Sequence, residues 1–382
     1  MGPLEGVKII EIAGIGPGPF AAMLLADMGA DVIRIDRPKK DGPGIAIPDR
    51  ANVLNRGRRS VAVDLKSPEG IETILKLIEQ ADGFLEGFRP GVTERLGIGP
   101  DVCMKRNPKL VYGRMTGWGQ DGPMASVAGH DIDYIALSGV LHAIGPKDGK
   151  PTPPLNLVGD FGGGGMFLAF GLVCGIMEAQ KSGKGQIVDA AMIEGSALLA
   201  NMFFSFRATQ SWLEERGTNI LDGGADFYDT YETKDGKYMA VGAIEPQFYA
   251  RLLELTGSDP DLSNGQLDRE NWPARKDSLT AIFKTKNRDE WTELMEREEA
   301  CTVPVLTLSE SLEHPHIKAR EVFVNHEGVD QVAPAPRFSR TSPKLDLPPP
   351  APGEHTSEVL SDFGISEEEI ATLKENGAVV QS

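Results

Sequence analysis

At 382 residues the chain is longer than one ordinary domain, so we expect more than one domain. Hydrophobic residues make up 40% of the sequence and charged residues 25%, which is typical of a soluble globular protein. The formal net charge of -17 argues against general affinity for nucleic acid or an anionic membrane surface, because both need a positive field.

Residues 7–12 are rich in strand-forming side chains, and a Gly- and Pro-rich turn at 14–19 follows them. An apolar helical stretch then runs to Met28 and a second strand candidate covers 31–35, which predicts a βαβ unit. Candidates at 67–78, 83–86 and 110–114 continue the alternation of helices and strands. The fold class is therefore α/β, with a Rossmann-like large domain and a parallel sheet.

The pattern changes after Lys181. One long helix is predicted from Met192 to about Glu214, and two strand candidates then flank the hairpin signal Lys234-Asp235-Gly236. We expect a smaller α+β domain joined to the large domain by two linkers. The predicted bounds are 1–190 for the large domain, completed by 330–382, 191–225 for a linker helix, 226–310 for the small domain and 311–330 for the return linker.

The three cysteines are far apart in the sequence and form no CxxC pair, so we predict reduced thiols and no metal site. Residues 1–6 lack the basic and apolar regions of a signal peptide. The apolar stretch 166–177 is interrupted by glycine, which predicts a buried helix rather than a membrane span. We therefore expect a cytoplasmic protein that does not enter a membrane.

The first glycine turn resembles a dinucleotide fingerprint, because Gly14 and Gly16 follow a strand and Asp36 ends the next one. However, Pro19 stands at the third glycine position and Pro17 stiffens the loop. A tight turn gives the same pattern, so a nicotinamide-dependent oxidoreductase is the minority interpretation.

A basic cluster surrounds the strand candidate near residue 60. Guanidinium groups bind phosphate oxygens through paired, charge-assisted hydrogen bonds, so the cluster could hold a nucleotide with several phosphates. The alternative is a solvated face neutralised by nearby carboxylates. The members of the cluster are Arg34, Arg37, Arg56, Arg58, Arg59 and Lys66.

Three acid–base side chains stand at predicted helix starts, namely His130, Asp160 and Glu245. The N–H groups of a helix start suit a developing oxyanion, whereas simple capping is the alternative for the two carboxylates. As a base, Glu245 would need burial that raises its pKa. No short-range feature of the sequence brings the three together.

Longer motifs resemble the family III CoA-transferase superfamily, namely GIGPGP at 14–19, RIDRP at 34–38 and EGFRPGVTERLG at 86–97. Three others resemble its bacterial α-methylacyl-CoA racemase branch, namely AGHDIDY at 128–134, NLVGDFGGG at 156–164 and GAIEPQFY at 242–249. The resemblance runs from about residue 4 to residue 340.

The resemblance implies interconversion of (2R)- and (2S)-2-methylacyl-CoA thioesters through an enolate. His130, hydrogen-bonded to Asp160, would be one acid–base group and Glu245 the other, because racemisation needs one group on each face of the enolate. Asn156 would support the pair. The helix start at His130 and Asp131 would hold the thioester oxygen.

Coenzyme A would be part of the substrate, with no tightly bound cofactor and no metal. The superfamily further implies an interlocked homodimer in which Glu245 of one subunit faces His130 of the other. The implied coenzyme A contacts are Arg37, Val63, Asp64, Leu65, Lys66, Gly87, Phe88, Arg89, Arg95, Gly129, Asp131, Ile132, Asp133 and Tyr134.

Two other functions stay open. In a CoA-transferase of the same superfamily, the carboxylate at Asp160 would be a nucleophile, and neither His130 nor Glu245 would be needed for a second proton transfer. A non-enzymatic protein that only binds acyl-CoA is the third interpretation.

Overall fold

The computed structural model describes residues 2–38, 47–343 and 345–382. The chain divides into two compact units. The large unit comprises Met1–Ser138, Leu155–Leu199 and Glu321–Ser382, and the small unit comprises Gly139–Pro154 and Ala200–Arg320.

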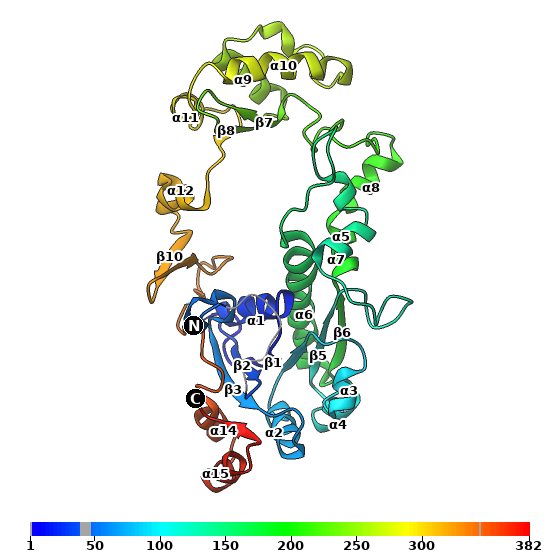
Figure 1. The fold of residues 1–382 in the computed structure, drawn as a ribbon, viewed down its shortest axis with the longest axis vertical. Coiled ribbons are helices and arrows are strands. Elements are labelled where there is room, and N and C mark those ends of the chain that lie inside the picture. Colours follow the sequence, from blue (N-terminus) through cyan, green and yellow to red (C-terminus); the bar gives the residue numbers. More distant parts are fainter. Residues whose placement is uncertain (1, 39–46, 344) are drawn as a thin grey trace. The chain divides into compact units, whose positions relative to one another are not determined.

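The large unit is built on one twisted sheet whose strands run parallel, except for the last, which is antiparallel to its neighbour (Figure 1). Its order is β12-β3-β2-β1-β4-β5-β6, so the six parallel strands have the doubly wound order 3-2-1-4-5-6. The α/β prediction is confirmed. The strands are β1 (Lys8–Ile12), β2 (Asp31–Asp36), β3 (Arg58–Val63), β4 (Gly83–Glu86), β5 (Val111–Thr116), β6 (Gln186–Ala191) and β12 (Val379–Val380).

Helices cover both faces of this sheet because side chains along a strand point alternately to opposite faces. Ile10 and Ile33 join one apolar core with α2 (Pro68–Ile78), α4 (Pro100–Arg106), α14 (Thr356–Asp362) and α15 (Glu367–Glu375). Ile9 and Val32 join a second core with α1 (Pro17–Asp27) and α6 (Met166–Ser182). In Figure 1 the red helix α14 lies beside the blue strand β3.

Within the described residues, one helical stretch, 157–182, is long and apolar enough to cross a membrane. It packs Leu168, Leu172 and Ile176 into the second core of the large unit. A helix in the core of a soluble protein can be equally long and apolar.

The small unit contains an antiparallel sheet of β7 (Tyr228–Glu232), β8 (Tyr238–Gly242) and β9 (Thr302–Pro304). The hairpin between β7 and β8 is confirmed, with Gly236 at a φ of 75° and Thr233 N–H bonded to Lys237. Its aromatic core is closed by α9 (Pro246–Thr256), α10 (Trp272–Phe283) and α11 (Arg288–Met295).

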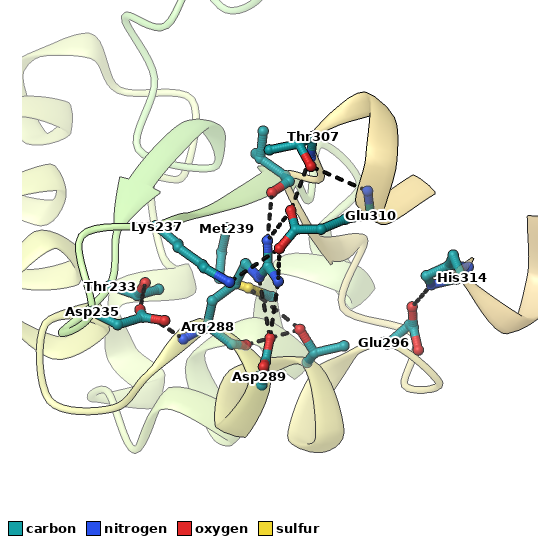
Figure 2. Close-up of polar contacts among 12 residues, drawn as sticks. Thr233, Asp235, Lys237, Met239, Arg288, Asp289, Glu296, Thr307, Glu310 and His314 are labelled. Carbon is teal, nitrogen blue, oxygen red and sulfur yellow. Dashed lines mark hydrogen bonds and ion pairs between the residues drawn. The ribbon is translucent and has the colours of Figure 1, made fainter. Parts of the chain in front are cut away.

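An ion-pair cluster fixes α12 (Leu308–Glu313) within the small unit (Figure 2). Both Arg288 Nη atoms donate to Glu310 at 2.9 Å, and Lys237 Nζ lies 3.0 Å from the same carboxylate. The Arg288 guanidinium holds the pKa of Glu310 well below its usual range. The predicted return linker at 311–330 thus begins inside an anchored helix.

The predicted linker helix is two helices, α7 (Met192–Leu199) and α8 (Asn201–Ala208), and the boundary between the units lies at their junction. The prediction of one helix to Glu214 is wrong. Gln210 has a φ of 59°, and the N–H groups of Gln210 and Ser211 bond back to Arg207 and Phe206. This closure usually uses glycine, and with glutamine at position 210 the end of the helix could not be recognised from the sequence.

Candidate active site

Asp160 lies against the turn that follows β1. A Cβ atom added to Gly16, whose φ is 67°, would lie 3.1 Å from its Oδ2 atom. Next to it, Phe161 stacks on Phe20 of α1 with ring centroids 4.6 Å apart. In this strand order β1 and β4 lead to opposite faces of the sheet, and ligands of such folds bind outside the carboxyl ends of the strands. Asp160 therefore lies at the edge of the sheet where ligands of such folds bind.

The backbone around Asp160 is a nine-residue π-helix, η4 (Leu157–Gly165). π-Helical turns are rare and concentrate at functional sites. This one fits against α7 only because two glycines meet there, since a Cβ atom on Gly195 would lie 1.8 Å from the carbonyl oxygen of Gly163. The sequence predicts Asp160 at the start of an ordinary helix, whereas it lies inside a wider turn.

His130 is the exposed residue directly before α5 (Asp131–Leu137). Its backbone N–H donates to Asp133 Oδ2 at 2.9 Å. Tyr134 braces the turn, since its hydroxyl donates to the carbonyl of Gly129 and its ring packs edge-on against Trp118 at 4.8 Å. The imidazole thus lies beside a rigid helix start whose N–H groups suit an oxyanion.

The Asp131 carboxylate joins the His130 and Asp160 segments. Asp131 is 7% exposed, and its Oδ2 atom accepts the backbone N–H of Asp160 at 2.7 Å. Its Oδ1 atom is buried and has no hydrogen-bond partner among the described residues. The sequence predicts Asp131 as a coenzyme A contact and gave no sign of this bond between segments.

The Asp160 carboxylate accepts a hydrogen bond from Asn156 Nδ2 at 3.1 Å. Burial raises the pKa of Asp160 and the charge of Asp131 adds to the effect, whereas the Asn156 bond and the positive charge of His130 oppose it. Among the described residues the predicted hydrogen bond between His130 and Asp160 is absent, and Asn156 is the side chain that donates to this carboxylate. The two groups interact through their charges.

Glu245 belongs to the small unit, where it directly precedes α9. Its carbonyl accepts the N–H groups of Phe248 and Tyr249, but its exposed carboxylate has no ion pair or hydrogen bond within the described chain. Gln266, a residue that the sequence did not mark, braces the preceding turn by donating to the carbonyls of Ala243 and Ile244 at 3.1 and 2.9 Å.

The residues assigned to coenzyme A lie at or just after the carboxyl ends of β2, β3 and β4, within α3 (Val92–Leu96), and from Gly129 into the first turn of α5. Parallel strands bring these ends to one edge of the sheet. Val63 is buried, Leu65 and Phe88 pack on the first core, Asp64 caps the N–H of Lys66, and Ile132 is exposed. The exposed cations of the set are Arg37, Lys66, Arg89 and Arg95.

Four arginines of the predicted basic cluster are engaged within the protein. The fully buried Arg58 bonds Glu11 at 3.1 Å, and Arg34 bonds Glu11 and Asp36 at the same distance. Arg56 pairs with Asp27 at 2.6 Å and Arg59 with Asp31 at 2.8 Å. Of the two interpretations, neutralisation by nearby carboxylates therefore holds for these four, although they are largely buried rather than solvated, and the exposed members of the cluster are Arg37 and Lys66.

Asp36 does not fit the dinucleotide interpretation. It is 9% exposed, and its carboxylate accepts hydrogen bonds from Arg34 Nε and from Ser60 Oγ, the latter at 2.7 Å. A residue that binds a ribose needs an accessible carboxylate. Asp36 is instead part of the buried ion-pair network.

Comparisons with known proteins agree with this architecture. Residues 4–356 match CoA-transferase family III. The chain is 45% identical over 375 residues to an alpha-methylacyl-CoA racemase of Mus musculus and 43% identical over 377 residues to that of Homo sapiens, covering 97% of this chain and 96% of each relative. A solved CAIB/BAIF family protein from Brucella suis superimposes with a TM-score of 0.79 at 26% identity, over 95% of this chain and 99% of that chain. The chain therefore belongs to CoA-transferase family III.

Proposed function

We propose that the protein is an isomerase that interconverts (2R)- and (2S)-2-methylacyl-CoA thioesters by proton transfer through an enolate. The observation that carries the proposal is that the bond from Asp131 to the Asp160 backbone brings the half-buried Asp160 carboxylate of η4 to the His130 helix start, where the two side chains interact through charge. The racemase relatives, 43% and 45% identical over nearly the whole chain, support it.

His130 takes the α-proton from one face of the thioester, and Asp160 stabilises the imidazolium that forms. The N–H groups at the start of α5 hold the thioester oxygen as negative charge develops on it. Glu245 returns a proton on the opposite face. In the reverse direction the two groups exchange roles.

Coenzyme A enters as part of the substrate rather than as a tightly bound cofactor in this proposal. The exposed cations Arg37, Lys66, Arg89 and Arg95 would pair with its phosphates. They give the local positive charge that a protein of net charge -17 needs for an anionic substrate.

The proposal includes a homodimer in which Glu245 comes from the partner subunit. It is supported by apolar side chains that one polypeptide leaves exposed on the large unit. These are Leu157, Met166, Phe170, Met177, Leu198 and Leu199. A cytoplasmic location stays a prediction.

The test starts from one pure enantiomer of a 2-methylacyl-CoA in D2O, with no acceptor acid present. We expect deuterium at C2 and growth of the other enantiomer, followed by mass spectrometry and chiral separation. In His130→Ala the growth of the other enantiomer should be lost, because inversion needs a base on each face. A CoA-transferase would instead leave C2 unlabelled and move coenzyme A to an added carboxylate. Binding without either reaction would support the non-enzymatic alternative.

A further inference from the structure

The Glu86 side chain turns back onto the loop that follows its own strand. Glu86 ends β4 and is 0% exposed. Its Oε2 atom accepts the backbone N–H of Phe88 at 2.6 Å, and its Oε1 atom accepts Arg114 Nε at 3.2 Å. The carboxylate thus fixes the loop at residues 87–89, where Arg89 is exposed.

Arg114, on the neighbouring strand β5, donates hydrogen bonds to two carboxylates. Besides Glu86, it donates through Nη1 to Glu94 Oε1 at 2.9 Å. Glu94 lies on α3, and the next residue is the exposed Arg95. One buried guanidinium therefore connects the segments that carry Arg89 and Arg95.

Arg89 also lies near the turn before α5, because its positive charge acts on Tyr134 and opposes the burial that raises the pKa of that hydroxyl to about 12. Tyr134 in turn braces Gly129, next to His130. The charge on the loop after β4 thus acts on the residue that braces the His130 helix start. A shift of this loop would move Arg89 relative to the reacting centre.

Burial raises the pKa of Glu86 to about 7, although the Phe88 N–H and the Arg114 charge both favour its ionised form. The titratable groups that face it are Arg114 and Tyr112 from β5 and Glu94 from α3. The ionised carboxylate is the stronger acceptor for a buried N–H. The loop is therefore held more firmly when Glu86 is charged.

We propose, on the basis of the proposed function, that Glu86 is a positioning residue for coenzyme A: its ionised carboxylate fixes the 87–89 loop and, through Arg114 and α3, sets the spacing of Arg89 and Arg95. Glu86 does not touch the substrate. It governs the affinity for the coenzyme A portion of the ligand rather than the proton transfer at C2.

Glu86→Gln tests the inference, with Asp27→Asn as the matched control. Asp27 is also a buried carboxylate of the large unit paired with an arginine, Arg56 at 2.6 Å, but it does not contact the coenzyme A segments. At pH 8 we expect Glu86→Gln to raise KM for the acyl-CoA and Kd for free coenzyme A about tenfold, with kcat within about twofold of wild type. Asp27→Asn should leave Kd unchanged. An unchanged Kd for Glu86→Gln, or an equal rise in both variants, would overturn the inference.

The pH dependence of coenzyme A binding distinguishes a positioning role of Glu86 from a general disturbance of the fold by the substitution. The coenzyme A phosphates titrate identically with every variant, so the ratio of the Kd of Glu86→Gln to the wild-type Kd isolates Glu86. This ratio should shrink toward one as pH falls from 8 to 5.5, because the wild-type carboxyl is then also neutral. A ratio that does not change with pH would contradict the role of the charge.

Hydrogen–deuterium exchange of the wild-type peptide covering residues 84–92 gives a test that needs no variant. After correction for the intrinsic exchange rate, protection should be greater at pH 8 than at pH 5.5, and equal protection would overturn the inference even if Glu86→Gln fails to fold. If wild-type protein neither binds coenzyme A nor exchanges the α-proton, the proposed function fails. If it does both while Glu86→Gln binds normally, only the present inference fails.

Discussion

The Asp131 carboxylate accepts the backbone N–H of Asp160 at 2.7 Å, and this bond ties the helix that begins after His130 to the π-helix that carries Asp160. The charge of Asp131 also acts on Asp160. The same side chain therefore holds the segment of the second carboxylate in place and adds to the rise in its pKa, of which burial is the largest cause.

We expect substitutions of the two neighbours of Asp160 to shift the acid limb of the kcat–pH profile in opposite directions. Asn156→Leu removes a hydrogen bond to the ionised form, which raises the pKa of Asp160 further and moves the limb to higher pH. Asp131→Asn removes a negative charge but keeps an acceptor for the Asp160 N–H, so the limb moves to lower pH. Profiles of kcat against pH for the three proteins check this, and shifts in the same direction would contradict it.

His130→Ala and Glu245→Ala should have unequal effects on the two enantiomers. Each replacement removes the base on one face, so abstraction from one enantiomer should fall by about 10²- to 10⁴-fold while the other still exchanges its α-proton. Deuterium uptake from each pure enantiomer in D2O measures both directions. Equal losses in both directions would mean that a single base serves both faces.

Gly195→Ala should destabilise the large unit by about 2 kcal/mol or more and lower kcat, because the new Cβ atom would overlap the carbonyl of Gly163 and push η4 away from α7. Gly18→Ala is the control, since a Cβ atom added there meets nothing within 4 Å. Thermal unfolding and kcat of both variants check the prediction. Similar behaviour of the two would show that the glycine contact is dispensable.

The stability of Glu86→Gln relative to wild type should rise with pH. Because the folded-state pKa of Glu86 is raised to about 7, its contribution to folding is fully present below the ordinary value of 4.5 and is lost as pH rises through 7. The loss is on the order of 3 kcal/mol when complete. Chemical unfolding of both proteins at pH 5.5 and 8 measures it. A fall in the stability of Glu86→Gln relative to wild type between pH 5.5 and pH 8 would contradict the raised pKa of Glu86.

The sheet could be predicted from the sequence because its signals are local. Runs such as residues 7–12 and 31–35 carry apolar side chains on successive positions, as strands covered on both faces require. The helix starts at His130 and Glu245 were also local signals. Local patterns of this kind were enough for the fold class and marked the three residues as candidates, whereas their acid–base roles came from the motif resemblance.

The basic cluster was misread because the partners of its arginines are distant in the sequence. Arg58 meets Glu11 across 47 positions and Arg56 meets Asp27 across 29. The sequence of a run of arginines does not show whether distant carboxylates or solvent surround their side chains in the folded protein. The roles of Asp131 and Gln266 were missed for a similar reason, because each acts on the backbone of a segment more than 20 positions away.

Strand β12 and helix α14 also bear on how the protein is made. The N–H of Asp64 bonds the carbonyl of Ala378, and Val359, Leu360 and Phe363 fill the core beside Ile33 and Val61. A ribosome completes every residue of the small unit before it supplies these side chains. The large unit is thus begun before the small unit and completed after it, and the part of its apolar core that α14 fills stays exposed until that helix emerges.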